Sequence, residues 1–139
     1  MTLALLFPGQ GSQHVGMGSG LAAGEPVASE VFAEADEALG FSLSSLMRDG
    51  PSEELTETQN AQPALLAHSV AALRVLGIRY PTSTSPAFGA GHSLGEFSAY
   101  VAAGTVTFVD ALRAVRLRGE LMSEAGKNSP GTMAAILGL

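Results

Sequence analysis

Cysteine and tryptophan are absent from this sequence of 139 residues. Without cysteine the chain can form no disulfide framework, no thiolate nucleophile and no sulfur-ligated metal site. Basic residues are few: seven Lys and Arg face thirteen Asp and Glu, for a net charge of -6. This balance argues against binding to nucleic acid or to an anionic membrane. The N-terminal apolar run, residues 3–7, is too short for a signal peptide or membrane span, so we expect a cytoplasmic protein.

What remains is an Ala/Gly/Leu-rich chain with 46% hydrophobic and 14% charged residues, which is typical of a folded globular protein. A chain of this length buries about two-thirds of its unfolded surface, which suffices for one core and not for two full domains. Nine of the thirteen acids precede residue 61, whereas six of the seven bases follow residue 60. The second part of the chain is therefore locally basic.

The hydrophobic pattern predicts an α/β fold. Short apolar runs predict strands over residues 3–7 and 87–90, and the first has the continuous apolar character of a strand buried on both faces of a parallel sheet. Periodicity and capping residues predict helices over 26–39, 42–47, 64–76, 96–103 and 110–125. Pro63 should open the third of these, which is apolar nearly all round and should lie between two layers.

The last residues, 132–139, are again apolar and strand-like. Domains usually end in a surface segment, whereas such a run requires neighbours on both sides. We therefore expect this chain to be the N-terminal part of something longer. The alternative is an edge strand that folds back on this domain.

Gly91-His92-Ser93-Leu94-Gly95 matches the nucleophile elbow, in which a serine sits on a strained turn between a strand and a helix. The predicted strand before this motif and the helix after it supply the required context. Ser93 is therefore the candidate nucleophile, and the backbone N–H of Leu94 is the candidate oxyanion donor. The alternative is a glycine-rich turn whose Ser93 caps the following helix.

A serine needs a neighbouring base, and the chain offers three histidines. His92 adjoins Ser93, and neighbouring side chains on such a backbone usually diverge. His68 falls on the apolar helix, where a core histidine is the simpler interpretation, and His14 has no obvious carboxylate to orient it. The general base is therefore expected to lie outside this chain.

Arg118 is the single charge on the apolar face predicted for helix 110–125, a face that also includes Ala111, Val115 and Leu121. Arg113 and Arg116 project from the far side, as a solvated face or a weak docking patch. An inward guanidinium needs an anionic partner, and its planar fork suits a carboxylate. That partner is either an internal Asp or Glu or a bound ligand, and the spacing alone leaves both open.

Together these motifs resemble the malonyl-CoA:acyl carrier protein transacylase family, the acyltransferases of fatty acid and polyketide synthesis. The resemblance covers essentially the whole chain and rests on four features in family order: Phe7-Pro8-Gly9-Gln10-Gly11-Ser12-Gln13, Gln62-Pro63-Ala64-Leu65-Leu66, Gly91-His92-Ser93-Leu94-Gly95-Glu96 and Arg118.

The resemblance implies a reaction. Ser93 would be acylated by malonyl-CoA, the backbone N–H groups of Gln10 and Leu94 would hold the oxyanion, and Arg118 would pair with the malonyl carboxylate. The phosphopantetheine thiol of acyl carrier protein would then take the malonyl group. No metal and no cofactor are implied.

The resemblance also implies an α/β-hydrolase-like core with a parallel sheet. Residues 1–130 would be its N-terminal part, and residues 131–139 would begin the first strand of a small ferredoxin-like subdomain. The base histidine would lie beyond, in a complementary C-terminal segment. Two alternatives stay open: a serine esterase with the same elbow, and a catalytically silent fragment that needs the complementary segment.

Overall fold

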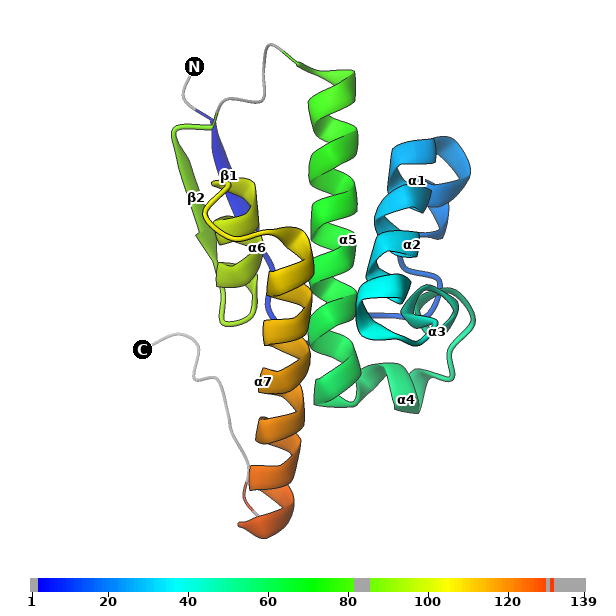
Figure 1. The fold of residues 1–139 in the computed structure, drawn as a ribbon, viewed down its shortest axis with the longest axis vertical. Coiled ribbons are helices and arrows are strands. Elements are labelled where there is room, and N and C mark those ends of the chain that lie inside the picture. Colours follow the sequence, from blue (N-terminus) through cyan, green and yellow to red (C-terminus); the bar gives the residue numbers. More distant parts are fainter. Residues whose placement is uncertain (1–2, 82–85, 130, 132–139) are drawn as a thin grey trace, which may run out of the picture.

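The computed structural model describes residues 3–81, 86–129 and 131. The chain forms an α/β structure, with a small sheet at one side and helices making up the rest (Figure 1). In chain order the elements are β1 (Ala4–Phe7), α1 (Ser19–Gly24), α2 (Pro26–Leu39), α3 (Leu43–Asp49), α4 (Ser52–Thr56), α5 (Thr58–Arg79), β2 (Phe88–Gly91), α6 (Gly95–Ala102) and α7 (Phe108–Asn128). The strand expected over residues 132–139 lies outside the described residues.

The two strands are parallel, and Ala4 pairs with Phe88 and Phe7 with Gly91. Both strands therefore end at the same edge of the sheet. Two loops start from that edge: the glycine-rich segment after β1, and the turn from β2 into α6. In open α/β sheets this edge is where ligands bind. The register thus brings together two segments that are about 80 residues apart in the sequence.

The long helix α5 lies at the centre of the molecule, between α1 and α2 on one side and α6 and α7 on the other (Figure 1). The expectation of an apolar helix between two layers is confirmed. Within the described part of the chain, α5 is also the one helix long and apolar enough to cross a membrane. Because 61% of that stretch is buried, α5 is a core helix of this fold.

The start predicted for this helix is wrong. We expected Pro63 at its first position, but α5 begins at Thr58 and Pro63 lies inside it. Proline has no N–H, so the carbonyl of Gln59, four residues earlier, has no helical donor. That carbonyl instead accepts a hydrogen bond from Arg116 Nη1 at 3.2 Å. A side chain from α7 thus replaces the bond that Pro63 cannot make.

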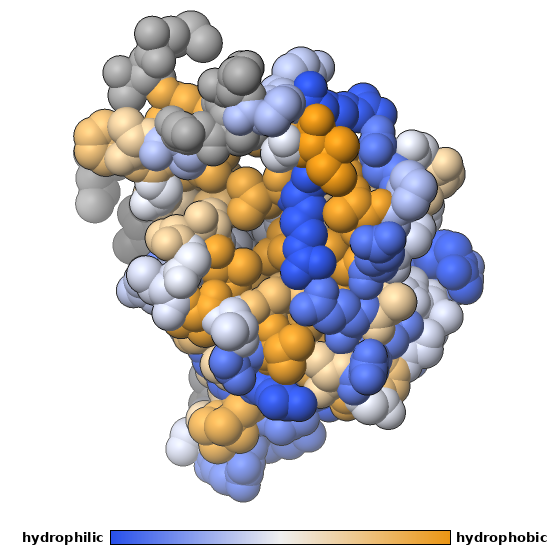
Figure 2. All heavy atoms as spheres, turned by 45° about the horizontal axis from the view of Figure 1, so that its top comes forward, coloured by the Kyte–Doolittle hydropathy of each residue, from blue (hydrophilic) through white to orange (hydrophobic). Residues whose placement is uncertain are grey.

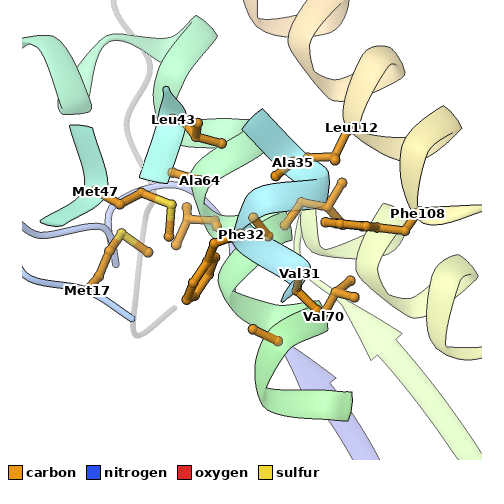
Figure 3. Close-up of a cluster of buried hydrophobic side chains, with 14 of the residues drawn as sticks. Met17, Val31, Phe32, Ala35, Leu43, Met47, Ala64, Val70, Phe108 and Leu112 are labelled. Atoms are coloured by element: carbon orange, nitrogen blue, oxygen red, sulfur yellow. The ribbon is translucent and has the colours of Figure 1, made fainter. Parts of the chain in front are cut away.

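The core lies where α2, α3, α5 and α7 meet. Phe32 of α2 is near its centre, with Met17 and Met47 on one side and Phe108 of α7 on the other (Figure 3). The fully or nearly fully buried side chains include Val31, Leu43, Leu66, Leu112 and Val115. Burying a side chain of this size contributes about 1.5–3 kcal/mol. The helices of the described region therefore hold most of its apolar packing.

The sheet contributes less to this core than expected. We expected Leu3 to Phe7 to be buried on both faces and residues 87–90 to form a buried strand, but Leu6 is 79% exposed and Phe88 is 69% exposed. The physical reason is that, among the described elements, α6 makes the main helix contacts to the two strands, so much of the sheet is left uncovered. Apolar surface is visible among hydrophilic residues on the sheet end of the molecule (Figure 2).

The buried face of α7 is rotated from the predicted one. Leu121, assigned to the buried face, is 56% exposed, whereas Leu112 is fully buried. The helix packs on α5 along the row Ala111, Val115 and Gly119. A Cβ on Gly119 would lie 2.6 Å from the Gln59 Cα, so the backbones of the two helices are nearly in contact there. Arg118 lies next to this contact.

Candidate active site

Ser93 lies on the turn between β2 and α6. Its φ is 56°, and it is the one non-glycine residue in the described ranges with positive φ. This left-handed conformation costs an L-residue about 1–2 kcal/mol. Two hydrogen bonds hold the turn: Gly95 N–H donates to the His92 carbonyl at 2.9 Å, and Glu96 N–H donates to the Ser93 carbonyl at 3.2 Å. The segment therefore has the strained strand-to-helix geometry that its sequence predicts.

The glycines of the motif lie where backbone meets backbone. A Cβ on Gly95 would lie 2.5 Å from the Phe7 carbonyl oxygen, and a Cβ on Gly91 would overlap the backbone of Gly95. The N–H of His92 also donates to the Phe7 carbonyl at 3.1 Å. The end of β1 and the turn at Ser93 thus pack together with no side chain between them, which is why both positions require glycine.

The backbone N–H groups of Gln10 and Leu94 are the predicted oxyanion donors at this edge. Within the described part of the chain, neither the N–H of Gln10 nor that of Leu94 has a hydrogen-bond acceptor. Gln10 follows β1 and Leu94 follows β2, so both come from segments that leave the same sheet edge. Unpaired N–H groups fixed in this way are suited to donate to an oxygen that becomes negative during a reaction.

The Arg118 side chain forms a hydrogen bond with Ser93. Its Nη2 donates to Ser93 Oγ at 2.9 Å, and its Nη1 donates to the Gln62 Oε1 at 2.7 Å. Both acceptors are neutral, and Arg118 forms no ion pair with any Asp or Glu of the described residues. An internal salt bridge, one of the two partners left open by the sequence, is thus absent from the part of the chain seen here. Among the described residues, the positive charge beside Ser93 therefore has no acidic partner.

No role was predicted for Gln62, which opens the motif Gln62-Pro63-Ala64-Leu65-Leu66, but the structure places it at the site. Its side chain is completely buried, its Oε1 accepts from Arg118, and its Nε2 donates to the Met122 Sδ at 3.4 Å. The contact to sulfur occupies the amide nitrogen, so the amide oxygen faces the arginine. A buried amide thus orients the guanidinium without neutralising it. In the sequence Gln62 follows the polar residues Thr58, Gln59 and Asn60 closely, so its polarity alone does not mark it.

Arg116 has a structural role instead of the solvated or docking role expected for it. Its Nη1 donates to Asn60 Oδ1 at 2.6 Å as well as to the Gln59 carbonyl, and its Nε donates to Glu120 Oε1 at 2.6 Å. Its guanidinium also lies 5.1 Å from the centre of the Phe41 ring. The bonds to Asn60 and Gln59 fasten α7 to the start of α5. Arg113 is exposed, as expected.

None of the three histidines hydrogen-bonds Ser93 within the described residues. His68 is partly buried on α5, and burial, helped by the nearby charge of His14, lowers its pKa from the ordinary 6.5. His92 is exposed and its ring packs against Gly9. In the described ranges, no three His, Asp or Glu side chains are grouped to hold a metal ion. The described part of the site therefore holds a serine hydroxyl, a cation hydrogen-bonded to it, and backbone N–H groups without acceptors.

Comparison with known proteins places these features in a family. The family model described as acyl transferase domain matches residues 4–138. The chain belongs to the acyl transferase domain family. It is 52% identical over 136 residues to the malonyl CoA-acyl carrier protein transacylase of Escherichia coli K12, and 54% identical over 137 residues to that of Bacillus subtilis 168. These matches cover 98% and 99% of this chain but 43% and 42% of the relatives.

Solved structures of acyl transferase family members give the same result. An acyl carrier protein S-malonyltransferase from Vibrio cholerae matches with a TM-score of 0.85 and 50% identity, over 90% of this chain and 40% of that one. A malonyl-transacylase solved in complex with a type II polyketide acyl carrier protein matches with the same TM-score and identity. The chain thus spans less than half the length of the relatives it matches.

Proposed function

We propose that this chain carries the nucleophilic half of a malonyl-CoA:acyl carrier protein transacylase. In the first step Ser93 Oγ loses its proton and attacks the thioester carbon, the C–S bond breaks, and coenzyme A leaves as the thiol. In the second step the phosphopantetheine thiol of acyl carrier protein attacks the seryl ester, and Ser93 regains its proton. No cofactor takes part, and the reaction belongs to cytoplasmic fatty acid or polyketide synthesis.

The contact between Arg118 and Ser93 is the observation that carries this proposal. A malonyl group on Ser93 ends in a carboxylate two carbon atoms beyond the ester carbon. The guanidinium already touches Ser93 Oγ and has no acidic partner in the described region, so it is placed to take that carboxylate. An esterase of neutral acyl chains has no use for this cation. Pairing with Arg118 would also fix the acyl group for transfer rather than hydrolysis.

The oxyanion would be stabilised by main-chain donors. When a thiol or Ser93 attacks, negative charge develops on the acyl oxygen, and the free N–H groups of Gln10 and Leu94 are suited to receive it. Ser93 also stands directly before α6, whose N-terminus favours negative charge. One donor of this kind typically contributes about 10²- to 10³-fold in rate.

We infer that a complementary C-terminal segment supplies the general base. The described residues place no histidine on Ser93, and the relatives are more than twice as long as the matched region. A groove beside β2 and α6, lined by Phe88, Gly89, Ala99 and Tyr100 among others, gives such a segment an apolar surface to cover. On this proposal residues 1–130 belong to the α/β-hydrolase-like core, and residues 131–139 begin the small ferredoxin-like subdomain.

Intact mass spectrometry tests the proposal. The chain is incubated with malonyl-CoA, with and without the complementary segment, and Ser93→Ala serves as control. We expect a malonyl adduct that requires Ser93 and that a pantetheine thiol discharges. An adduct that forms only after the segment is added supports the proposal that this chain supplies the nucleophile and the segment supplies the general base. Rapid discharge to water would favour the esterase, and no adduct in the complete system would overturn the proposal.

A further inference from the structure

The loop that carries the Gln10 donor is tied to the start of α5. The Gln10 Nε2 donates to the Thr58 Oγ1 at 3.2 Å. Among the described residues, this is the one hydrogen bond that joins residues 8–13 to a helix. The other bonds of the loop are internal: Gly11 N–H donates to Gln13 Oε1 at 2.8 Å, and Ser12 Oγ donates to the Gly9 carbonyl at 3.0 Å. Thr58 is therefore the one residue of a described helix that holds the loop by a hydrogen bond.

Thr58 and Gln62 lie four residues apart on α5, so they occupy one face of that helix. Thr58 contacts the loop that carries the oxyanion donor, and Gln62 contacts Arg118, which touches the nucleophile. The start of α5 thus holds two parts of the site at a fixed separation. This helix is rigid there, because Gln62 and Pro63 are buried and α7 packs directly on Gln59.

We propose that Thr58 is a positioning residue for the oxyanion donor at Gln10. It touches no reacting atom; it anchors the Gln10 side chain so that the backbone N–H of the same residue faces the acyl oxygen. The packing of His92 on Gly9 limits the loop from the opposite side, since a Cβ on Gly9 would lie 2.8 Å from the His92 carbonyl oxygen. This inference rests on the function proposed above.

The effect of removing the anchor can be separated from an effect on substrate binding. A misplaced donor weakens stabilisation of the transition state and leaves the ground state nearly unchanged, so kcat falls while KM holds. We expect a loss in kcat of about tenfold, less than the roughly 10²- to 10³-fold that follows complete removal of such a donor. Because the oxyanion forms on every acyl group, malonyl and acetyl transfer should fall by the same factor.

Three variants form the test, assayed with the chain and its complementary segment on malonyl-CoA and acetyl-CoA. Thr58→Val keeps the shape and removes the hydroxyl, Thr58→Ser keeps the hydroxyl, and Gln10→Ala removes the other end of the contact but keeps the backbone N–H. We expect Thr58→Val and Gln10→Ala each to lower kcat by the same factor for malonyl and acetyl transfer. The double variant that combines them should be no slower than either single variant, and Thr58→Ser should retain activity. Unfolding curves verify that each variant is folded.

The outcomes separate the two proposals. If the unaltered protein transfers acyl groups and Thr58→Val has the same kcat, the role of Thr58 is overturned while the proposed function stands. A loss confined to malonyl, or one seen only in KM, also overturns it, because neither reports on the oxyanion. Failure of the unaltered protein to transfer any acyl group overturns the proposed function, and this inference with it.

Discussion

Replacing Gln62 with glutamate should lower the preference for a carboxylated acyl group without disabling Ser93. The Gln62 Oε1 lies 2.7 Å from Arg118 Nη1, so Gln62→Glu puts a permanent carboxylate at hydrogen-bond distance from the cation. A bond to a charged partner contributes about 1.5–3 kcal/mol against about 1 kcal/mol for a neutral one. The internal anion therefore competes with the malonyl carboxylate by about 0.5–2 kcal/mol, or roughly 2- to 30-fold in kcat/KM.

The assay compares kcat/KM for malonyl-CoA and acetyl-CoA with a pantetheine thiol as acceptor. Acetyl transfer makes no use of the cation, so it should stay within about twofold of the unaltered protein. Gln59→Glu is the matched control: it adds the same charge one turn earlier, where the side chain contacts Glu57 rather than Arg118. Equal losses for both substrates, or an undiminished malonyl preference, would refute the reasoning.

Two further predictions concern stability. Gly119→Ala should lower the free energy of unfolding by about 1–3 kcal/mol through overpacking, because its Cβ would lie 2.6 Å from the Gln59 Cα. In the control Gly126→Ala, on the same helix, the added Cβ meets nothing within 4 Å, so helix propensity should raise the free energy of unfolding by up to about 1 kcal/mol. Urea unfolding measures both variants, and equal responses would contradict the packing described. His68 has a pKa lowered by burial, so the unfolded chain binds more protons and stability should fall as the pH drops below 6.5. The His68→Gln variant should lack that component, and identical pH profiles for the two proteins would contradict it.

Most elements and the turn at Ser93 could be predicted because their signals are local. The turn at Ser93 is specified by five consecutive residues, and the helix that carries Arg118 by periodicity within one segment. The N-terminus of α5 was misplaced because proline normally opens a helix, and nothing near Pro63 in the sequence indicates that Arg116 supplies the missing donor. The burial of the strands was overestimated. An apolar run shows that a strand would be stabilised by burial, but it does not show that another layer packs on it.

The residues that position the site were not predictable in the same way. Gln62 reaches Arg118 across 56 positions in the chain, and Gln10 reaches Thr58 across 48. Such contacts depend on how α5 and α7 cross and on where the loop after β1 lies. No pattern in a single segment contains that information. The sequence therefore indicates candidate groups for the chemistry, and the packing shows which side chains contact them.

The central claim is tested most directly by the rate at which Ser93 is acylated in Arg118→Ala. Mass spectrometry measures that rate with malonyl-CoA and with acetyl-CoA, with the complementary segment present. Arg113→Ala, which removes the same charge from the exposed side of α7, is the control. Loss of a charged hydrogen bond should lower the rate of malonyl acylation by about 10- to 150-fold, while acetyl acylation persists. A malonyl preference that survives in Arg118→Ala would contradict the account, because the cation beside Ser93 would then not select the acyl group.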